Sequence, residues 1–192
     1  MLTVAWDIDD CLNDLMRLWF EEKWIPEHPD CGLKYADIKD NPPHKLLGVS
    51  KEAYLNSLDE FRKSPNYRNM PPNPEVAAWF SHNGDFFRHI ALSAVPAHAA
   101  NISAEWLMRH FGTWIRTFNF VPSLREGFSS GPCDRSKKDF LRWFGKVDVF
   151  IDDNEQNIRD SQELGIKGLL FPRPWNSSKS TVKEILGRLR KD

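Results

Sequence analysis

The sequence predicts an α/β protein with a doubly wound, Rossmann-like parallel sheet of about five strands and a small helical cap inserted after the first strand. Short apolar runs alternate with helical runs over most of the 192 residues, a pattern typical of parallel βαβ units. Residues 15–71 interrupt this alternation, because they are punctuated by prolines and contain no convincing strand. We therefore expect a core formed by residues 1–14 and 72–192, with residues 15–71 as the cap.

The first strand is predicted at residues 2–6, where Leu2, Val4 and Trp6 alternate with smaller residues before a cluster of carboxylates. Residues 15–24 have apolar side chains at helical spacing and are followed by Pro26, where we expect the helix to be interrupted. The clearest element in the rest of the cap is a helix at 51–62, with Ser50 as its N-cap.

Strands and helices alternate regularly after the cap. Capping residues and terminal glycines predict helices at 74–83, 102–111, 136–144, 155–164 and 181–191. Short apolar runs predict strands at 86–93, 114–121, 147–151 and 167–171. Residues 126–132, rich in Gly, Ser and Pro, are predicted to form a loop.

Charge and cysteine content argue against several classes of protein. The 26 Lys and Arg residues nearly balance the 27 Asp and Glu residues, so the chain lacks the basic excess typical of proteins that bind nucleic-acid polymers. The three cysteines show no C-x-x-C spacing, which argues against a disulfide framework or a zinc ribbon. No basic segment precedes the first strand and no apolar run approaches a membrane span, so we expect a cytoplasmic protein without membrane contact.

Polar side chains suited to a ligand site follow three of the predicted strands. They are Asp7, Asp9 and Asp10 after the first, Ser93 after the second, and Asp152 with Asp153 after the fourth. Ligands of doubly wound sheets bind beyond the carboxyl ends of the strands, so we expect these side chains to converge. Carboxylates at the end of an apolar strand repel one another and resist burial, which indicates a bound cation. Asp10 could instead be a helix N-terminal carboxylate.

The order of these residues along the chain resembles the haloacid dehalogenase-like hydrolase superfamily. The matching stretches are Asp7-Ile-Asp9, Ile90-Ala-Leu-Ser93, Lys137 or Lys138, and Phe150-Ile-Asp152-Asp153. Phosphate-receiver domains also combine acidic residues with Ser or Thr and Lys, but their acidic residues precede the lysine, whereas Asp152 and Asp153 follow it here.

The resemblance implies a Mg²⁺-dependent phosphatase. Asp7 would be the nucleophile that forms an aspartyl-phosphate, and Asp9 would exchange protons with the leaving group and with water. Mg²⁺ would be held by Asp7, Asp152 and the backbone carbonyl of Asp9, with Asp153 as a further ligand or as a residue behind the ligands. Ser93 and one lysine would bind the phosphoryl group.

Helical spacing favours Lys137 over Lys138 as the phosphate-binding lysine. Phe140, Leu141 and Phe144 lie three, four and seven positions after Lys137, as apolar residues do after the lysine of the family. Lys138 would then be a surface charge. Cys11 stands where the superfamily often has Thr or Val, and we interpret it as a small buried residue.

A narrower resemblance points to the 5′-nucleotidases of the cytosolic and mitochondrial deoxyribonucleotidase type. Residues 7–14 follow their D-x-D-G-V-L-A-D pattern, Pro71-Pro-Asn-Pro74 matches the stretch before their second strand, and Pro174-Trp-Asn176 resembles their P-Y-N. Asp10 replaces the usual Gly and Cys11 the usual Val. Aromatic residues of the first cap helix could stack on a nucleobase or form the core of the cap; they are Trp19, Phe20 and Trp24.

We therefore expect a Mg²⁺-dependent phosphomonoesterase that acts on a small phosphorylated substrate, with a nucleoside monophosphate as the first choice. A phosphatase for another small metabolite and a non-catalytic binding or regulatory protein are the alternatives. A dehalogenase is disfavoured, because hydrolysis at carbon needs neither Asp9 nor a metal cluster. The oligomeric state, a homodimer included, is left open by the sequence.

Overall fold

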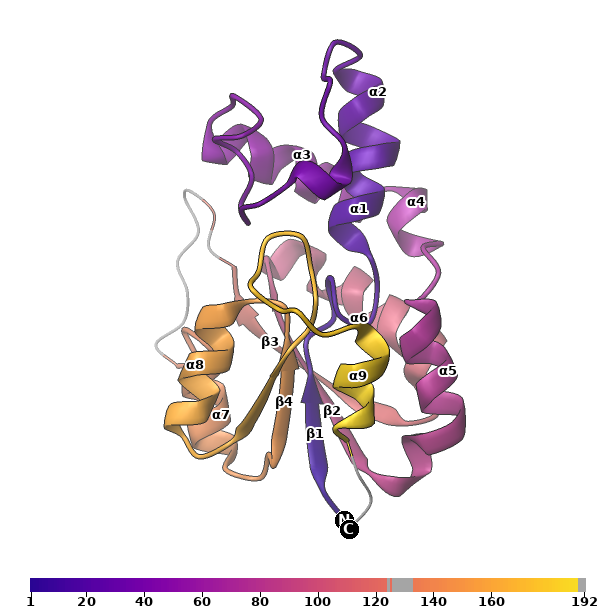
Figure 1. Cartoon of the computed structure of the whole chain (residues 1–192), viewed down its shortest axis with the longest axis vertical. Coiled ribbons are helices and arrows are strands. Elements are labelled where there is room, and N and C mark those ends of the chain that lie inside the picture. Colours follow the sequence, from indigo (N-terminus) through magenta and orange to yellow (C-terminus); the bar gives the residue numbers. More distant parts are fainter. Residues whose placement is uncertain (124, 126–132, 190–192) are drawn as a thin grey trace.

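The computed structural model describes residues 1–123, 125 and 133–189, and its centre is a five-stranded sheet. The strands are β1 (Thr3–Trp6), β2 (Arg88–Val95), β3 (Ile115–Pro122), β4 (Val149–Asp152) and β5 (Lys167–Leu170). They are all parallel and lie in the order β3-β2-β1-β4-β5. Figure 1 shows the sheet with helices on both sides. The predicted α/β doubly wound fold is confirmed.

Helices cover both faces of the sheet because neighbouring residues of a strand point to opposite faces. Val4 and Trp6 of β1 belong to one apolar cluster, and Ala5 between them belongs to another. The first cluster includes side chains of α5 (Pro74–Asn83), α6 (Ala97–Phe111) and α9 (Val182–Gly187). The second includes side chains of α7 (Lys137–Phe144) and α8 (Glu155–Glu163).

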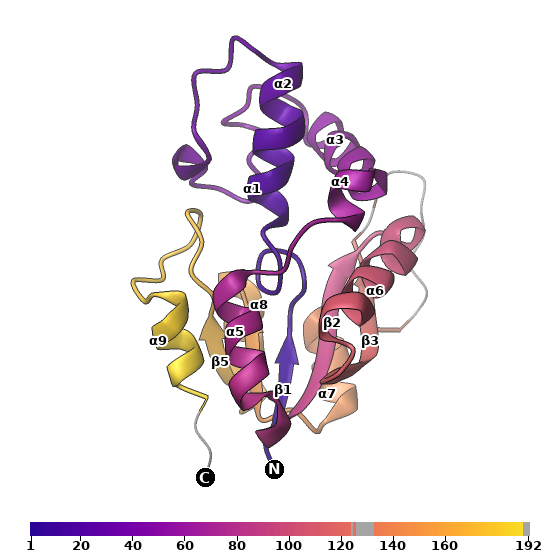
Figure 2. The ribbon, with the colours of Figure 1, turned by 90° about the vertical axis from the view of Figure 1, so that its right-hand side faces the viewer.

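The elements between β1 and α5 lie beyond the carboxyl ends of the strands, as Figure 2 shows. They are α1 (Leu15–Trp19), a π-helical turn (Phe20–Trp24), α2 (Ile25–Glu27), a 3₁₀ turn (Tyr35–Asp37), α3 (Lys51–Lys63) and α4 (Pro65–Arg68). We call residues 15–71 the cap. Ser50 caps α3 as predicted, because its Oγ accepts a hydrogen bond of 3.0 Å from Ala53 N.

Two element boundaries differ from the predictions in ways that matter for the site. The strand predicted at 86–93 continues to Val95, so Ser93 lies inside β2 rather than at its end. The helix predicted from residue 102 begins at Ala97, directly after Pro96, because Pro is well suited to precede a helix and alanines favour one.

The first cap helix also differs, because it continues past Pro26 as far as Glu27. The π-helical turn Phe20–Trp24 precedes this proline, and its wider bonding pattern accommodates the missing backbone N–H. At the other end of the chain, α9 stops at Gly187. The predicted loop 126–132 lies outside the described residues. Among the described helices, none has the length and apolar character needed to cross a bilayer.

Candidate active site

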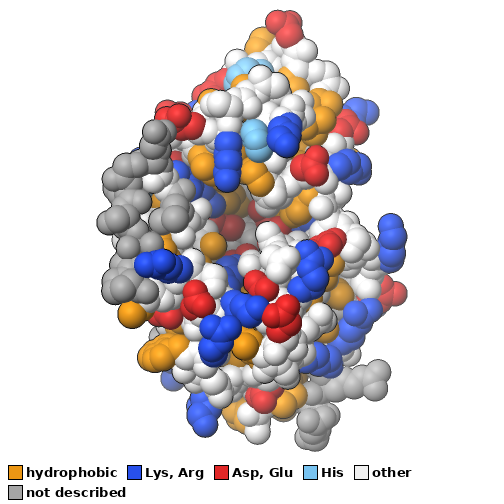
Figure 3. All heavy atoms as spheres, turned by 90° about the vertical axis from the view of Figure 1, so that its left-hand side faces the viewer, with side chains coloured by type: hydrophobic (Ala, Val, Ile, Leu, Met, Phe, Trp, Pro, Cys, Tyr) orange, Lys and Arg blue, Asp and Glu red, His pale blue; other side chains and the backbone are white. Residues whose placement is uncertain are grey.

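Asp7 lies at the point where β1 ends beside β4. Its backbone N–H donates to Ile151 O at 2.9 Å, which continues the pairing of the two strands. The chain turns to opposite sides of the sheet after β1 and after β4, so this edge is the topological switch point, where α/β proteins bind ligands. A cavity of about 480 Å³ opens there and includes Asp7 in its wall. Figure 3 shows one face of the molecule with a hollow between the cap and the core.

Lys137 joins the carboxyl ends of β1 and β4. Its Nζ lies 2.8 Å from Asp7 Oδ1 and 2.7 Å from Asp152 Oδ2, and its side chain is 3% exposed. Ser136 caps α7 by accepting a hydrogen bond from Asp139 N, so Lys137 is the first residue of this helix. Burial disfavours the ammonium charge, but Asp152 and Asp7 outweigh this effect and raise the pKa of Lys137. The site therefore holds a permanent positive charge.

The structure brings Lys137, and not Lys138, to the cavity. Lys138 pairs instead with Asp160 and Glu163 of α8 and does not line the cavity. The helical spacing that favoured Lys137 thus agrees with its position, whereas the alternative that Lys138 binds the phosphoryl group finds no support in where this side chain lies.

Asp152 and Asp153 follow β4 side by side but have different partners. Asp152 is fully buried and accepts hydrogen bonds from Asn154 N at 2.8 Å and from Asn157 Nδ2 at 3.1 Å. Asp153 Oδ2 accepts a bond of 2.7 Å from Trp175 Nε1. Burial, reinforced by the charge of Asp152, raises the pKa of Asp153 to about 7. The hydrogen-bonding roles of Asn157 and Trp175 were not predicted, although Asn157 lies shortly after Asp153 and Trp175 lies within the quoted stretch Pro174-Trp-Asn176.

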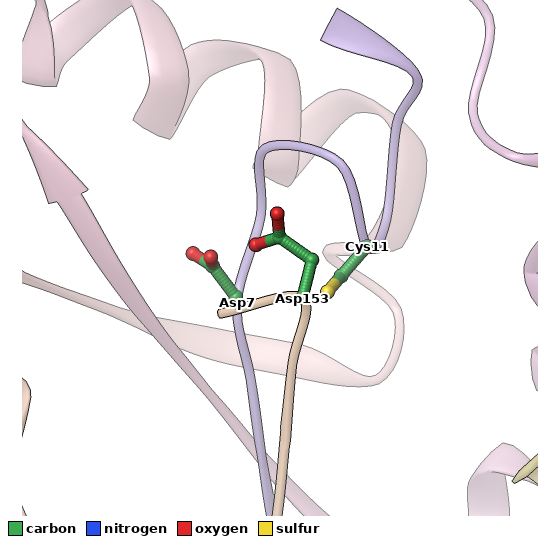
Figure 4. A group of neighbouring side chains, drawn as sticks. All are labelled: Asp7, Cys11 and Asp153. Atoms are coloured by element: carbon green, nitrogen blue, oxygen red, sulfur yellow. The ribbon is translucent and has the colours of Figure 1, made fainter. Parts of the chain in front are cut away.

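The carboxylates of Asp7 and Asp153 fit a hard divalent cation. One ligand atom each from Asp7, Asp153 and Cys11 lie within 4.8 Å of one another, and Figure 4 shows the three side chains together. Burial, with the nearby charges of Asp152 and Asp153, raises the pKa of Asp7 well above its ordinary value, and a bound cation would remove this penalty. Carboxylate oxygens are preferred ligands of Mg²⁺, whereas a thiol is not. Burial also raises the pKa of the Cys11 thiol, which keeps it protonated.

Asp9 lines the same cavity but is held by the cap. Arg62 Nη2 lies 3.0 Å from Asp9 Oδ2. Tyr67 OH and Asn13 Nδ2 each donate to Asp9 Oδ1 at 3.1 Å. The structure therefore places the predicted proton-transfer residue between core and cap. Sequence reasoning missed Arg62 and Tyr67, since nothing in a helical pattern shows which face of the cap meets the core.

Ser93 is not brought into the cavity. It is 1% exposed, and its Oγ has no hydrogen-bond partner among the described residues. The next residue, Ala94, lines the cavity instead, as expected when neighbouring side chains of a strand alternate. The predicted phosphate-binding role of Ser93 stays a prediction. Two residues that follow β3, Ser123 and Arg125, do line the cavity and were not predicted.

The turn that follows Asp9 explains the departure from the family pattern at Asp10. Its φ of 62° lies in the left-handed region, which Gly adopts freely and Asp tolerates better than most residues. Asp10 Oδ1 also accepts a bond of 3.0 Å from Met16 N. From the other side, Arg173 donates to Asp10 O at 2.6 Å and pairs with Asp14 Oδ1 at 2.6 Å. Arg173 thus fixes loop 7–14 from the segment after β5.

Comparison with known proteins supports the fold. No family model matches the sequence, and no curated protein matches it either. Among solved structures, a protein described as a predicted phosphatase from Clostridium acetobutylicum superimposes with a TM-score of 0.63 at 13% identity, over 98% of this chain and 97% of that one. A hydrolase from Streptococcus pneumoniae gives a TM-score of 0.61 at 14% identity, over 97% of each chain. A haloacid dehalogenase-like hydrolase from the same species gives 0.57 at 11% identity, over 96% of this chain and 90% of that one.

Proposed function

We propose that this chain, whose fold is that of haloacid dehalogenase-like hydrolases, is a Mg²⁺-dependent phosphomonoesterase that acts through a phosphorylated Asp7. The observation that carries the proposal is the contact between Lys137 and Asp7 at the switch point of the sheet, inside a cavity that Asp9 also lines. Burial raises the pKa of Asp7, the positive charge of Lys137 lowers it, and a bound cation would lower it further, so that Asp7 would be ionised, as a nucleophile must be.

The residues of the site divide the reaction into two steps. In the first, an oxygen of Asp7 attacks phosphorus while the bond to the leaving oxygen breaks, and Asp9 gives a proton to that oxygen. In the second, Asp9 takes a proton from water, the water oxygen attacks phosphorus, and the bond to Asp7 breaks. Lys137 stabilises the charge of the transferring group throughout. Mg²⁺ held by Asp7 and Asp153, with Asp152 and the backbone carbonyl of Asp9 as the further predicted ligands, would add positive charge beside that group.

A nucleoside monophosphate is the substrate class we place first. Support comes from the stretch that resembles the deoxyribonucleotidase pattern, because it contacts the site: Trp175 Nε1 donates to Asp153 Oδ2 and Asn176 Nδ2 donates to Asp153 O. The three aromatic residues of the first cap helix belong to the buried core cluster and do not line the cavity, so they cannot stack on a base there; they are Trp19, Phe20 and Trp24. A base would instead meet Tyr54, Leu55 and Leu58, which do.

A different small phosphorylated metabolite is the second candidate. The cavity wall includes the cationic side chains of Arg62, Arg125 and Lys51 in addition to Lys137. Arg62 and Arg125 are already paired with Asp9 and Asp59, so Lys51 and a bound Mg²⁺ are the charges that would favour a compact anionic substrate over an uncharged base.

Phosphate release from a panel of nucleoside monophosphates, sugar phosphates and small phosphorylated acids tests the proposal, with Mg²⁺ and with a chelator. We expect release from part of the panel, dependent on Mg²⁺ and lost in Asp7→Asn. The absence of release from every compound, or full activity in Asp7→Asn, would overturn it and favour a binding or regulatory protein.

A further inference from the structure

The cap contacts the core at Asp9, the residue that transfers protons in the proposed reaction. Both carboxylate oxygens of Asp9 accept hydrogen bonds, and two of the three donors among the described residues come from the cap. Arg62 of α3 contacts Oδ2, and Tyr67 of α4 contacts Oδ1. The third donor, Asn13, belongs to loop 7–14. The side chain of Asp9 is 12% exposed, so these contacts are little screened by water.

Each of the two cap donors is also linked to a second residue of the core, either directly or through one further side chain. Tyr67 OH lies 3.0 Å from Ser103 Oγ of α6, and since the Tyr67 proton goes to Asp9, the serine hydroxyl donates to Tyr67. Arg62 Nη1 donates to Asp59 Oδ1 at 3.1 Å. Asp59 in turn accepts from Arg125 Nε at 2.7 Å and Nη2 at 2.8 Å, just beyond β3. Two series of contacts therefore hold Asp9 in position. Each begins at Asp9, passes through a cap residue and ends at another residue of the core.

The two terminal nitrogens of the Arg62 guanidinium each donate to a carboxylate, Nη1 to Asp59 and Nη2 to Asp9. Its Nε is buried and has no hydrogen-bond partner among the described residues, although buried donors in purely structural roles are almost always bonded. Burial disfavours its charge, but Asp9 and Asp59 outweigh this effect and raise the pKa of Arg62. Arg62 also lines the cavity where the substrate would enter.

We propose that Arg62 and Tyr67 are cap-borne positioning residues, which hold the carboxyl group of Asp9 where it can protonate the leaving oxygen. This inference rests on the proposed function, because it concerns the proton transfer of the first step. As the bond from phosphorus to the leaving oxygen breaks, its electron pair stays on that oxygen and the proton of Asp9 joins it. A displaced Asp9 would leave the oxygen unprotonated.

The need for that proton depends on the leaving group, and this dependence separates positioning from general structural support. An alkoxide is a strong base and leaves slowly without a proton, whereas p-nitrophenolate is stable and leaves readily. Loss of Arg62 or Tyr67 should therefore slow the release of an alkyl leaving group and spare that of an aryl one. The quantity to compare is kcat/KM, which reports the steps up to departure of the leaving group.

The experiment measures kcat/KM of the full-length protein with Mg²⁺ on its best alkyl phosphate from the panel and on p-nitrophenyl phosphate. The variants are Arg62→Gln, Arg62→Lys, Tyr67→Phe and Asp9→Asn. We expect Arg62→Gln to lower kcat/KM for the alkyl ester by roughly 10- to 100-fold, part of the ~10²–10⁴-fold worth of general acid catalysis, and to change it less than about threefold for the aryl ester. Arg62→Lys should restore part of the loss, and Tyr67→Phe should show a smaller loss of the same selectivity.

A matched control is Arg68→Ala, which removes an ion pair between cap and core that does not touch Asp9. Arg68 Nη1 contacts Glu105 of α6 at 2.8 Å, and its side chain is 40% exposed. This variant should leave both kcat/KM values unchanged. The double variant Asp9→Asn with Arg62→Gln should lose no more alkyl ester activity than Asp9→Asn alone, because both changes remove one function.

Equal losses on the two esters, no loss on either, or additive losses in the double variant would overturn the inference while the proposed function stands. A variant that folds poorly lowers kcat/KM for both esters together. An equal loss in Arg62→Gln therefore overturns the inference only if Tyr67→Phe also loses activity equally on the two esters. A wild-type protein that hydrolyses neither ester would instead overturn the proposed function, and the inference with it.

Discussion

Lys137 Nζ lies 2.8 Å from Asp7 Oδ1, and this contact joins the loop after the first strand to the start of α7. The same ammonium group lies 2.7 Å from Asp152 Oδ2. One buried cation thus holds together two carboxylates that would otherwise repel each other at the ends of β1 and β4. The arrangement explains how an acidic site persists in the core of the sheet.

The two adjacent lysines should differ sharply in their effect on activity. Lys137→Met removes the charge beside Asp7, and we expect kcat to fall by about 10²-fold or more, as when other groups that stabilise the transition state are removed. Lys138→Met, which alters only the ion pairs with α8, should stay within about twofold of the wild type. Steady-state phosphate release measures both. Equal effects of the two substitutions would contradict the assignment of Lys137.

Trp175 should strengthen metal binding through Asp153. Trp175→Phe keeps the ring but removes the Nε1 donor to Asp153 Oδ2, and we expect Mg²⁺ to bind about tenfold more weakly, as when partners of metal ligands are removed. Isothermal titration with Mg²⁺ gives the affinity. Trp143→Phe is the control, since Trp143 is 73% exposed and outside the cavity. Unchanged affinity in Trp175→Phe would argue against Asp153 as a ligand.

Arg173 should be important for stability. Arg173→Met removes the buried partner of Asp14, which is left with the exposed Arg17 as its ion-pair partner, and it frees the carbonyl of Asp10. We expect the free energy of unfolding to fall by about 3 kcal/mol, the usual cost of breaking a buried ion pair. Urea denaturation measures this value. Arg188→Met, an exposed change, should alter it by less than about 0.5 kcal/mol. A loss for Arg173→Met no larger than this would show that loop 7–14 is fixed by other contacts.

The backbone at Asp10 predicts an unusual order of stability. Glycine normally destabilises a protein relative to alanine, but at a φ of 62° the Cβ of alanine costs about 1–2 kcal/mol. Asp10→Gly and Asp10→Ala lose the same bond to Met16 N. We therefore expect the glycine variant to be the more stable of the two by about 1 kcal/mol in urea denaturation. The opposite order would show that the turn relaxes.

Asp59 should contribute to stability in a way that depends on pH. Burial raises the pKa of its carboxyl, but Arg125 and Arg62 outweigh this effect and lower the pKa below its ordinary value. A lowered folded-state pKa stabilises the fold above the unfolded value of about 4 and loses this effect as the pH falls through the folded value. The stability difference between wild type and Asp59→Asn should thus be constant near neutral pH and shrink below about pH 4. A difference that persists unchanged into acid would contradict this.

The sequence alone predicts most of the fold and most of the site residues that the core contributes. Strands that end in carboxylates, such as β1 before Asp7 and β4 before Asp152, must bring these groups together once the sheet is parallel. The choice of Lys137 over Lys138 also followed from the sequence, because apolar residues follow Lys137 at helical spacing. Ser93 was predicted at the end of its strand, but β2 continues for two more residues to Val95, so Ser93 lies inside the strand with its side chain buried. Arg62 and Tyr67 could not be predicted, since their contacts with Asp9 arise only when the cap meets the core.

The proposed mechanism requires Asp7 to carry the phosphoryl group between its two steps. The most direct measurement is mass spectrometry of Asp9→Asn after acid quenching of its reaction with p-nitrophenyl phosphate and Mg²⁺, because the aryl group leaves without a proton while hydrolysis of the intermediate is slowed. If Asp7 is the nucleophile, the peptide containing Asp7 gains the mass of one phosphoryl group, and the same peptide of Asp7→Asn does not. A phosphoryl group on another residue, or phosphate release without any labelled peptide in the quenched protein, would contradict it.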